Sequence, residues 1–306
     1  MWRLAPRLAR LCLAAQASAA LLPGLLSLVG CPQPSSIDLP PLALEQALGH
    51  WKDAGEFLTL DRWRYRQGPQ VGEIWIAHIK PEGVQLSVEV ASNAPRRITE
   101  ITSLAEREPG DYLAINGGFY DDSGPLGLVV SHGHQVKRFR SNGGSGVFVV
   151  AGSVPEIMHR DAFKPSPEIH HALQSIDRLV ADGESLVRER TQARSDARSL
   201  VGIDDHLHLV LAVAYDARAV SQETAGVVYL NRQTTSTGVT LRDLAEFAAR
   251  DEKAGGLGLR WALNLDGGWS TALHARIEGQ PHGVVGYRGT INAIQARIPP
   301  AVRGSP

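Results

Sequence analysis

Cysteine is nearly absent from this chain of 306 residues, and the two that occur, Cys12 and Cys31, both lie near its N-terminus. The remainder has no pair that could form a disulfide, so its hydrophobic core alone must hold it together. Zinc sites built from thiolates are excluded there for the same reason. We expect neither a bound metal nor an organic cofactor.

The chain also lacks an excess of charge of either sign. Lysine and arginine number 31, aspartate and glutamate number 32, and the formal net charge is −1. No basic run with interleaved aromatic residues occurs, so no nucleic acid partner is expected. No apolar run after residue 31 is long enough to cross a bilayer. With 43% hydrophobic residues, the chain beyond its leader suits one large globular domain.

The first 31 residues have the pattern of a signal peptide: three arginines among the first ten residues, then apolar and small residues at 11–29. This run ends in Leu28-Val29-Gly30-Cys31, which resembles a bacterial lipobox in which Cys31 becomes lipidated. Two alternatives stay open, cleavage after Ala17-Ser18-Ala19 and an uncleaved membrane anchor. Lipidation predicts an exported protein held at the bacterial cell envelope, on its periplasmic or outer-membrane face, because several acyl chains anchor a protein stably.

Residues 32–49 are expected to form a tether between this leader and the folded body. Four prolines between residues 32 and 41 favour extended conformation. A short helix is possible at 42–48. The globular domain is expected at 50–298, followed by a tail at 299–306.

Short strands dominate the pattern of that domain. Apolar and polar residues alternate at 84–90, which predicts a half-buried strand, and residues 71–79 are predicted to pair with it in a hairpin. Pro81-Glu82-Gly83 would supply the turn. Asn142-Gly143-Gly144 is interpreted as another hairpin turn or as a flexible flap.

Helices are few in the same pattern. One is predicted at 97–107, and a clearer one at 241–253 begins with Thr240 and Asp243, which resemble a capping box. The sequence therefore predicts an α/β (mixed α+β) fold, namely a strand-rich single domain with a mixed sheet. The loops that carry its motifs are expected to converge at one sheet edge.

A buried strand at 261–265 stops at the first of two glycine motifs, Asp266-Gly267-Gly268-Trp269-Ser270-Thr271. Paired glycines permit positive φ and let a ligand approach the backbone closely. A carboxylate beside bare N–H donors suits an anionic substrate that also needs a proton moved. The alternative is a tight Asp-Gly turn in which Ser270 and Thr271 cap the next element.

The second glycine motif is similar. Asn116-Gly117-Gly118-Phe119-Tyr120 again follows a short apolar strand. Asn116 can donate and accept hydrogen bonds to sugar hydroxyls or phosphate, while Gly117 and Gly118 would expose backbone N–H groups. The alternative for Asn116 is an Asx turn at the strand end.

Together, these two motifs resemble the signature segments of the phosphodiester glycosidase family. Further matching segments follow in the family's order, at 125–130, 178–183, 198–204 and 288–294. The resemblance covers residues 71–297, and its specificity lies in the ordered co-occurrence of the segments. It implies a hydrolase that cleaves the glycosidic bond of a sugar-1-phosphodiester.

The resemblance also implies roles for particular residues. Asp266 would be the catalytic carboxylate, as nucleophile or as base, and Asn116 would contact the substrate. Arg198 would bind phosphate, because a guanidinium holds two phosphate oxygens at once; without the resemblance it is a surface arginine. The remaining candidates for substrate binding are Gly117, Gly118, Gly267, Gly268, Trp269, Ser270, Thr271 and Asp182.

Three positions complicate this assignment. Asp182-Gly183 is also an ordinary hairpin turn, which is the interpretation we favour. Ile176-Asp177 stands where the family often has Gly-Pro. Trp269 replaces a residue that is small in the family, so it either stacks on a sugar or narrows the site.

The expected partners are a phosphorylated glycan or sugar-phosphodiester as substrate and the membrane through the lipid anchor. Two other functions fit the same sequence. One is a non-catalytic lipoprotein of the same fold that binds glycan or peptidoglycan. The other is a metal-dependent phosphodiesterase that cuts on the phosphorus side.

Overall fold

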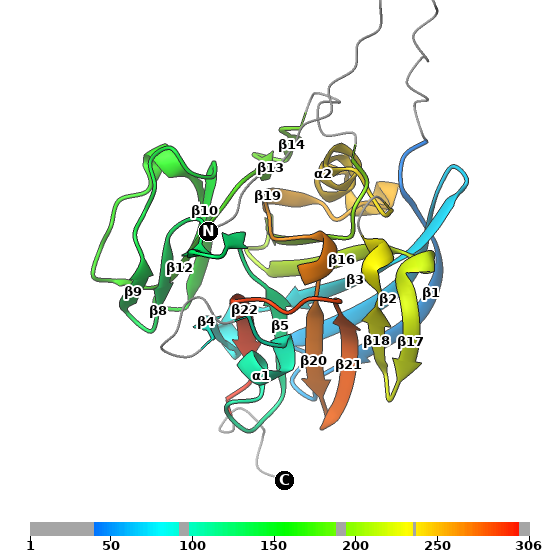
Figure 1. Cartoon of the computed structure of the whole chain (residues 1–306), viewed down its shortest axis with the longest axis horizontal. Helices are drawn as coiled ribbons and strands as arrows, with labels where there is room; N and C mark the ends of the chain where they lie inside the picture. The colour runs from blue at the N-terminus through cyan, green and yellow to red at the C-terminus, as the bar shows by residue number, and fades with distance from the viewer. Residues whose placement is uncertain (1–39, 92–97, 188–193, 235–236, 300–306) are drawn as a thin grey trace, which may run out of the picture. The chain divides into compact units, whose positions relative to one another are not determined.

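The computed structural model describes residues 40–91, 98–187, 194–234 and 237–299, which belong to one compact unit (Figure 1). The predicted signal peptide with Cys31, residues 32–39 of the predicted tether and most of the tail lie outside the described residues. Strands dominate, and the described chain contains two α-helices, α1 at Ile101–Ala105 and α2 at Leu241–Ala249. None of its helices is both long and apolar enough to span a bilayer.

The largest sheet has eight strands, and each pair of neighbours in it is antiparallel. Its order is β1 (Ala43–Lys52), β2 (Leu58–Gln67), β3 (Gln70–Ile79), β16 (Leu209–Asp216), β15 (Arg198–Asp204), β19 (Leu259–Asn264), β13 (Arg178–Ala181) and β14 (Glu184–Ser185).

A seven-stranded sheet contains the mixed pairing that was predicted. Strands β18 and β21 run parallel, and the other neighbours are antiparallel. Its order is β17 (Val220–Thr224), β18 (Val227–Leu230), β21 (Gln280–Val285), β20 (Leu273–Ile277), β5 (Tyr112–Asn116), β22 (Asn292–Arg297) and β4 (Gln85–Val90).

Two smaller sheets complete the domain. The five-stranded sheet has the order β11 (Val154–His159), β10 (Gly146–Ala151), β12 (Ile169–Ser175), β8 (Val129–Ser131) and β9 (His134–Lys137). The two-stranded sheet pairs β6 (Tyr120–Asp121) with β7 (Gly124–Pro125). The predicted strand-rich fold with few helices is thus confirmed.

One hydrophobic core joins the three large sheets. It takes Trp75 from the eight-stranded sheet, Ile115 from the seven-stranded sheet and Phe148 from the five-stranded sheet, all fully buried. The opposite face of the eight-stranded sheet, which includes Ile74 beside Trp75, packs against α2 in a second cluster. Alternate residues of β3 therefore serve different cores, as the period of two in a strand requires.

Several predicted elements differ from the structure. The predicted helix at 42–48 is wrong, because β1 covers residues 43–48 of it and pairs with β2. The folded body therefore begins before residue 50. The predicted hairpin between 71–79 and 84–90 is also wrong. Both segments are strands, but β3 lies between β2 and β16, whereas β4 pairs with β22.

The helices are shorter than predicted, but one capping prediction is confirmed. Helix α1 covers five residues of the predicted 97–107, and α2 ends at Ala249. At the start of α2, the Thr240 hydroxyl accepts a hydrogen bond from the Asp243 N–H at 3.1 Å and bonds the Asp243 carboxylate. This satisfies one N–H that has no partner within the helix.

Candidate active site

The two glycine motifs meet where the eight-stranded and seven-stranded sheets adjoin. Strand β19 runs beside β15, and its continuation crosses to the end of β5, where the Asp266 N–H donates to the Gly117 carbonyl at 2.9 Å. Two residues later, the Gly268 N–H donates to Ala197, just before β15, at 2.8 Å. The motifs therefore converge at the junction of two sheets, and not at the edge of one sheet as predicted.

The Asn116 side chain holds this junction together from inside. It is fully buried, and its Nδ2 donates to the main-chain oxygen of Asp266 at 2.6 Å. Its Oδ1 accepts from the Ser199 hydroxyl at 2.7 Å and from the Ala272 N–H at 3.0 Å. Both polar atoms of the carboxamide are occupied by hydrogen bonds within the protein. Asn116 therefore positions Asp266 and does not fit the predicted contact with substrate.

Gly117 and Gly118 serve the same junction. Their N–H groups donate to the main-chain and side-chain oxygens of Asn292, both at 2.8 Å. A Cβ on Gly117 would lie 1.9 Å from the Asn292 side-chain oxygen. These glycines allow close packing between β5 and β22, and their N–H groups are not available to a substrate, contrary to prediction.

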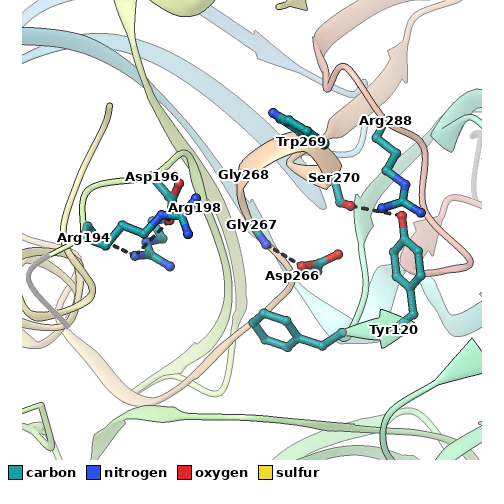
Figure 2. Close-up of a pocket in the computed structure, with 11 residues that line it drawn as sticks. Tyr120, Arg194, Asp196, Arg198, Asp266, Gly267, Gly268, Trp269, Ser270 and Arg288 are labelled. Atoms are coloured by element: carbon teal, nitrogen blue, oxygen red, sulfur yellow. Dashed lines mark hydrogen bonds and ion pairs between the residues drawn. The ribbon is translucent and has the colours of Figure 1, made fainter. Parts of the chain in front are cut away.

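A cavity of about 430 Å³ opens above Asp266. Figure 2 shows Asp266 between two groups of polar side chains, with Arg194, Asp196 and Arg198 to one side and Tyr120 and Arg288 to the other. The complete lining is Phe119, Tyr120, Arg194, Asp196, Arg198, Asp266, Gly267, Gly268, Trp269, Ser270 and Arg288.

Asp266 is half-buried, which is enough to change its acidity. Burial raises the pKa of its carboxyl group to about 6, because a charged carboxylate loses hydration there. Three groups act in the opposite direction, namely the Ser270 side chain, the Gly267 N–H and the charge of Arg288. A carboxyl group that titrates near pH 6 can act as a base or nucleophile at neutral pH.

The predicted phosphate ligand Arg198 does line this cavity. Its side chain is 13% exposed and donates to the carbonyls of Val239, at 3.3 Å, and Arg194, at 2.8 Å. Asp196 lies 3.8 Å from Arg198 and 3.1 Å from Arg194. Burial lowers the pKa of the Arg198 guanidinium, which stays charged because its ordinary value is so high.

On the other side of Asp266, Arg288 and Tyr120 form a second polar group. The Arg288 guanidinium carbon lies 5.4 Å from the centre of the Tyr120 ring. The Tyr120 hydroxyl lies 3.3 Å from the Ser270 hydroxyl and donates to Gly289 at 2.9 Å. Neither residue was among the predicted site residues, although Tyr120 ends one quoted motif and Arg288 opens another.

The first glycine motif, which begins at Asp266, does not form the predicted set of free N–H groups. The Gly267 N–H donates to its neighbour's carboxylate at 3.0 Å, and those of Ser270 and Thr271 close turns to Gly267 and Gly268. Thr271 is fully buried and lies outside the cavity lining. Positive charge in this cavity therefore comes from guanidinium groups.

Trp269 lies at the rim with 37% of its surface exposed. Its Nε1 donates to the Arg232 carbonyl at 3.2 Å, and its ring meets that of Tyr287 edge-on, with centroids 5.9 Å apart. The Arg232 guanidinium lies 4.8 Å from the Tyr287 centroid. Such an exposed aromatic pair offers an apolar face to a sugar.

Asp182 does not belong to this site. It sits in the turn between β13 and β14 with φ of +52°, and it is absent from the cavity lining. The structure thus agrees with the turn interpretation. No cluster of three or more potential metal-ligating side chains occurs among the described residues.

Comparison with known proteins identifies the family of this domain. A family model described as phosphodiester glycosidase matches residues 110–297. The uncharacterized protein YigE of Escherichia coli K12 is 37% identical over 115 residues, which are 34% of this chain and 45% of that protein. The present chain thus matches less than half the length of that relative.

Solved structures show the same fold. The catalytic domain of zebrafish N-acetylglucosamine-1-phosphodiester alpha-N-acetylglucosaminidase, auto-inhibited by its pro-peptide, matches with a TM-score of 0.57 at 16% identity, over 85% of this chain and 88% of that one. A hypothetical protein from Synechocystis matches with a TM-score of 0.50 at 17% identity, over 79% and 62%. At these identities the similarity concerns the fold alone.

The burial of Asp266 predicts a pH-dependent gain in stability for Asp266→Asn. Because the pKa is raised in the folded state, folding is penalised increasingly as the pH rises from about 4 to about 6, and fully above that. The neutral amide removes this penalty, so the variant should be more stable than the wild type at pH 8, by about 3 kcal/mol at most. Denaturant unfolding at pH 4 and pH 8 measures the difference.

Asp182→Asn is the matched control, because Asp182 is exposed and asparagine tolerates its positive φ. This control should show no such gain at pH 8. An Asp266→Asn variant with the same stability relative to wild type at both pH values would contradict the buried environment described for Asp266.

Proposed function

Because the chain belongs to the phosphodiester glycosidase family, we propose that it hydrolyses the glycosidic bond of a sugar-1-phosphodiester in the cavity around Asp266. The observation that carries the proposal is the half-buried carboxyl group of Asp266, with its pKa raised to about 6, in a cavity lined by three arginines. The cavity thus combines a base with positive charge for an anionic substrate.

The chemistry needs only one reactive carboxylate. In hydrolysis on the sugar side, water adds to the anomeric carbon, the bond from this carbon to the phosphate oxygen breaks, and the transition state resembles an oxocarbenium ion. Phosphate leaves readily without strong acid assistance. Asp266 therefore acts either as a nucleophile at the anomeric carbon or as the base that deprotonates water, and both roles require its ionised form.

The other acidic side chain of the cavity suits a different role. Asp196 pairs with Arg194 and lies near Arg198, so it orients those guanidinium groups. Arg198 has two of its five N–H donors on backbone carbonyls in this structure. Its remaining donors can bind the phosphate oxygens, which places the leaving group on this side of Asp266.

The sugar would then lie on the remaining sides of the cavity. Trp269 at the rim supplies a face on which a pyranose ring can stack, and Tyr120 supplies a hydroxyl. The zebrafish enzyme is named for its action on N-acetylglucosamine-1-phosphodiesters. An α-N-acetylglucosaminyl phosphodiester is therefore the first substrate to test.

Hydrolysis of an aryl α-N-acetylglucosaminyl phosphodiester tests the proposal. The rate constant kcat/KM should rise with pH to a plateau above about 6, because Asp266 must be ionised, and Asp266→Asn should lower it by ~10³-fold. With ¹⁸O-labelled water, the label should enter the sugar.

The other outcomes separate the rival functions. Label in the phosphate, together with loss of activity on chelation, would indicate a phosphodiesterase that attacks phosphorus. Equal and negligible rates for wild type and Asp266→Asn, with retained binding of the substrate, would indicate a glycan-binding protein.

The two arginines beside Asp266 should respond differently to removal. Arg288 lowers the pKa of Asp266 through its charge, so Arg288→Gln should move the acidic limb of the pH profile to higher pH. Arg198→Gln should lower kcat/KM by about 10- to 100-fold through lost phosphate binding. The acidic limb of its pH profile should stay at the wild-type pH. Arg138→Gln, at an exposed arginine outside the cavity, is the control.

Localisation at the cell envelope is a further part of the proposal; export depends on the leader at residues 1–31, and the lipid anchor depends on Cys31. We propose that the chain is exported and lipidated there. Phase partitioning in detergent should place the wild type from a bacterial host in the detergent phase and Cys31→Ala in the aqueous phase. Wild-type protein in the aqueous phase would refute the lipid anchor.

A further inference from the structure

A second cavity, of about 400 Å³, lies next to the first and shares one wall with it. The shared wall is Phe119, which lines both cavities. The side chains that set the charge of the second cavity are Arg140 and Arg160, and its lining contains no carboxylate. The full lining is Phe119, Leu126, Gly127, Arg140, Asn142, Gly143, Gly144, Ser145, Arg160, Gln174, Ser175 and Ile176.

The Arg140 guanidinium is largely uncommitted. Within the described residues it makes one hydrogen bond, a long one of 3.5 Å to the Leu126 carbonyl, and no ion pair. The carboxylate of Asp121 is close enough to interact with the charge of Arg140, but it accepts its hydrogen bond from the Ser123 hydroxyl. A guanidinium left in this state has donors free for an anion that enters the cavity.

Arg160 is more firmly held than Arg140. Its NH1 donates to the Gly143 carbonyl at 2.7 Å, and its Nε lies 3.4 Å from the exposed carboxylate of Asp161. That Nε is buried and makes no hydrogen bond within the described residues. Arg160 thus fixes the loop and brings a second positive charge to the same cavity.

A buried carboxamide keeps the wall of this cavity in place. The Gln174 Nε2 donates to the carbonyls of Arg140, at 2.8 Å, and Gly144, at 3.1 Å. Its Oε1 accepts from the N–H groups of Leu128, at 3.1 Å, and Arg140, at 3.2 Å. The segment around Asn142-Gly143-Gly144 connects β9 to β10 and lines the cavity, and its hydrogen bonds to Gln174 hold it in place. It is neither the hairpin turn nor the flexible flap that the sequence suggested.

We propose that the second cavity is a substrate subsite for a second anionic group, so that the substrate is a polyanionic glycan with charge on successive units. The inference depends on the proposed function, because the first cavity must hold the scissile phosphodiester. A glycan that spans both cavities passes Phe119, whose ring offers a stacking surface to the sugar between the two charges.

Binding to the full-length Asp266→Asn variant tests the subsite without hydrolysis. The two probes are α-N-acetylglucosamine 1-phosphate, with one phosphate, and a dimer of that repeat joined 1→6 through phosphate, with two. Calorimetry should show the dimer binding about fivefold more tightly or better, from one added exposed charge pair. This ratio should decrease with added salt.

Arg140→Gln in the same background should lower this ratio, because it removes the largely uncommitted guanidinium, while Arg160 and the Phe119 ring remain. The matched control is Arg138→Gln, two residues away and outside the cavity lining, which should retain the full ratio. Equal affinities for the two probes, a preference that Arg140→Gln leaves unchanged, or no measurable binding of either probe would each overturn the second subsite.

The hydrolysis assay keeps this proposal separate from the proposed function. If the wild type cleaves the aryl substrate but the dimer gains nothing from Arg140, the subsite is wrong and the glycosidase stands. If the wild type cleaves neither substrate but the dimer preference depends on Arg140, the subsite stands and the catalytic proposal fails.

Discussion

The candidate site depends on one buried side chain, the carboxamide of Asn116. It bonds the main chain of Asp266, the hydroxyl of Ser199 and the N–H of Ala272, and so connects strands of two different sheets. A buried amide with its donors and acceptor occupied is costly to rearrange, because each broken bond would leave a polar group without a partner. The position of Asp266 is therefore fixed by the interior of the protein, and its side chain is left for chemistry.

The same junction explains how Asp266 acquires its chemical character. Close packing through Gly117 and the turn at Gly268 bring the carboxyl group into a partly enclosed place, where burial raises its pKa. A raised carboxyl pKa opposes folding at neutral pH, which is the usual cost of a reactive group held ready. Arg288 offsets part of this effect, since its charge favours the ionised form of Asp266.

Carboxamides position both walls along the proposed substrate path. Asn116 fixes the strand ends beneath the first cavity, and Gln174 fixes the loop that lines the second. Both side chains are uncharged and buried, so they place the backbone without adding charge to either cavity. A substrate then meets the positive charge of Arg198 and Arg288 in the first cavity and of Arg140 in the second. Phe119 lines both cavities and separates these charges.

The sequence by itself determined which local segments matter. Short apolar runs predicted the strands before Asn116 and Asp266, because a strand that is buried on both faces has few polar residues, and paired glycines marked the tight junction. Asp266 and Arg198 were correctly expected in one place on the strength of a family resemblance. Only the tertiary structure decided which strands pair, so it separated β3 from β4 and placed residues 43–52 in a sheet. It also decided which polar groups are occupied: Asn116 and the glycine N–H groups are used inside the protein, whereas Arg288 and Tyr120 reach the cavity. The physical reason is that a side chain's hydrogen-bond partners come from strands distant in the sequence, and no local pattern records them.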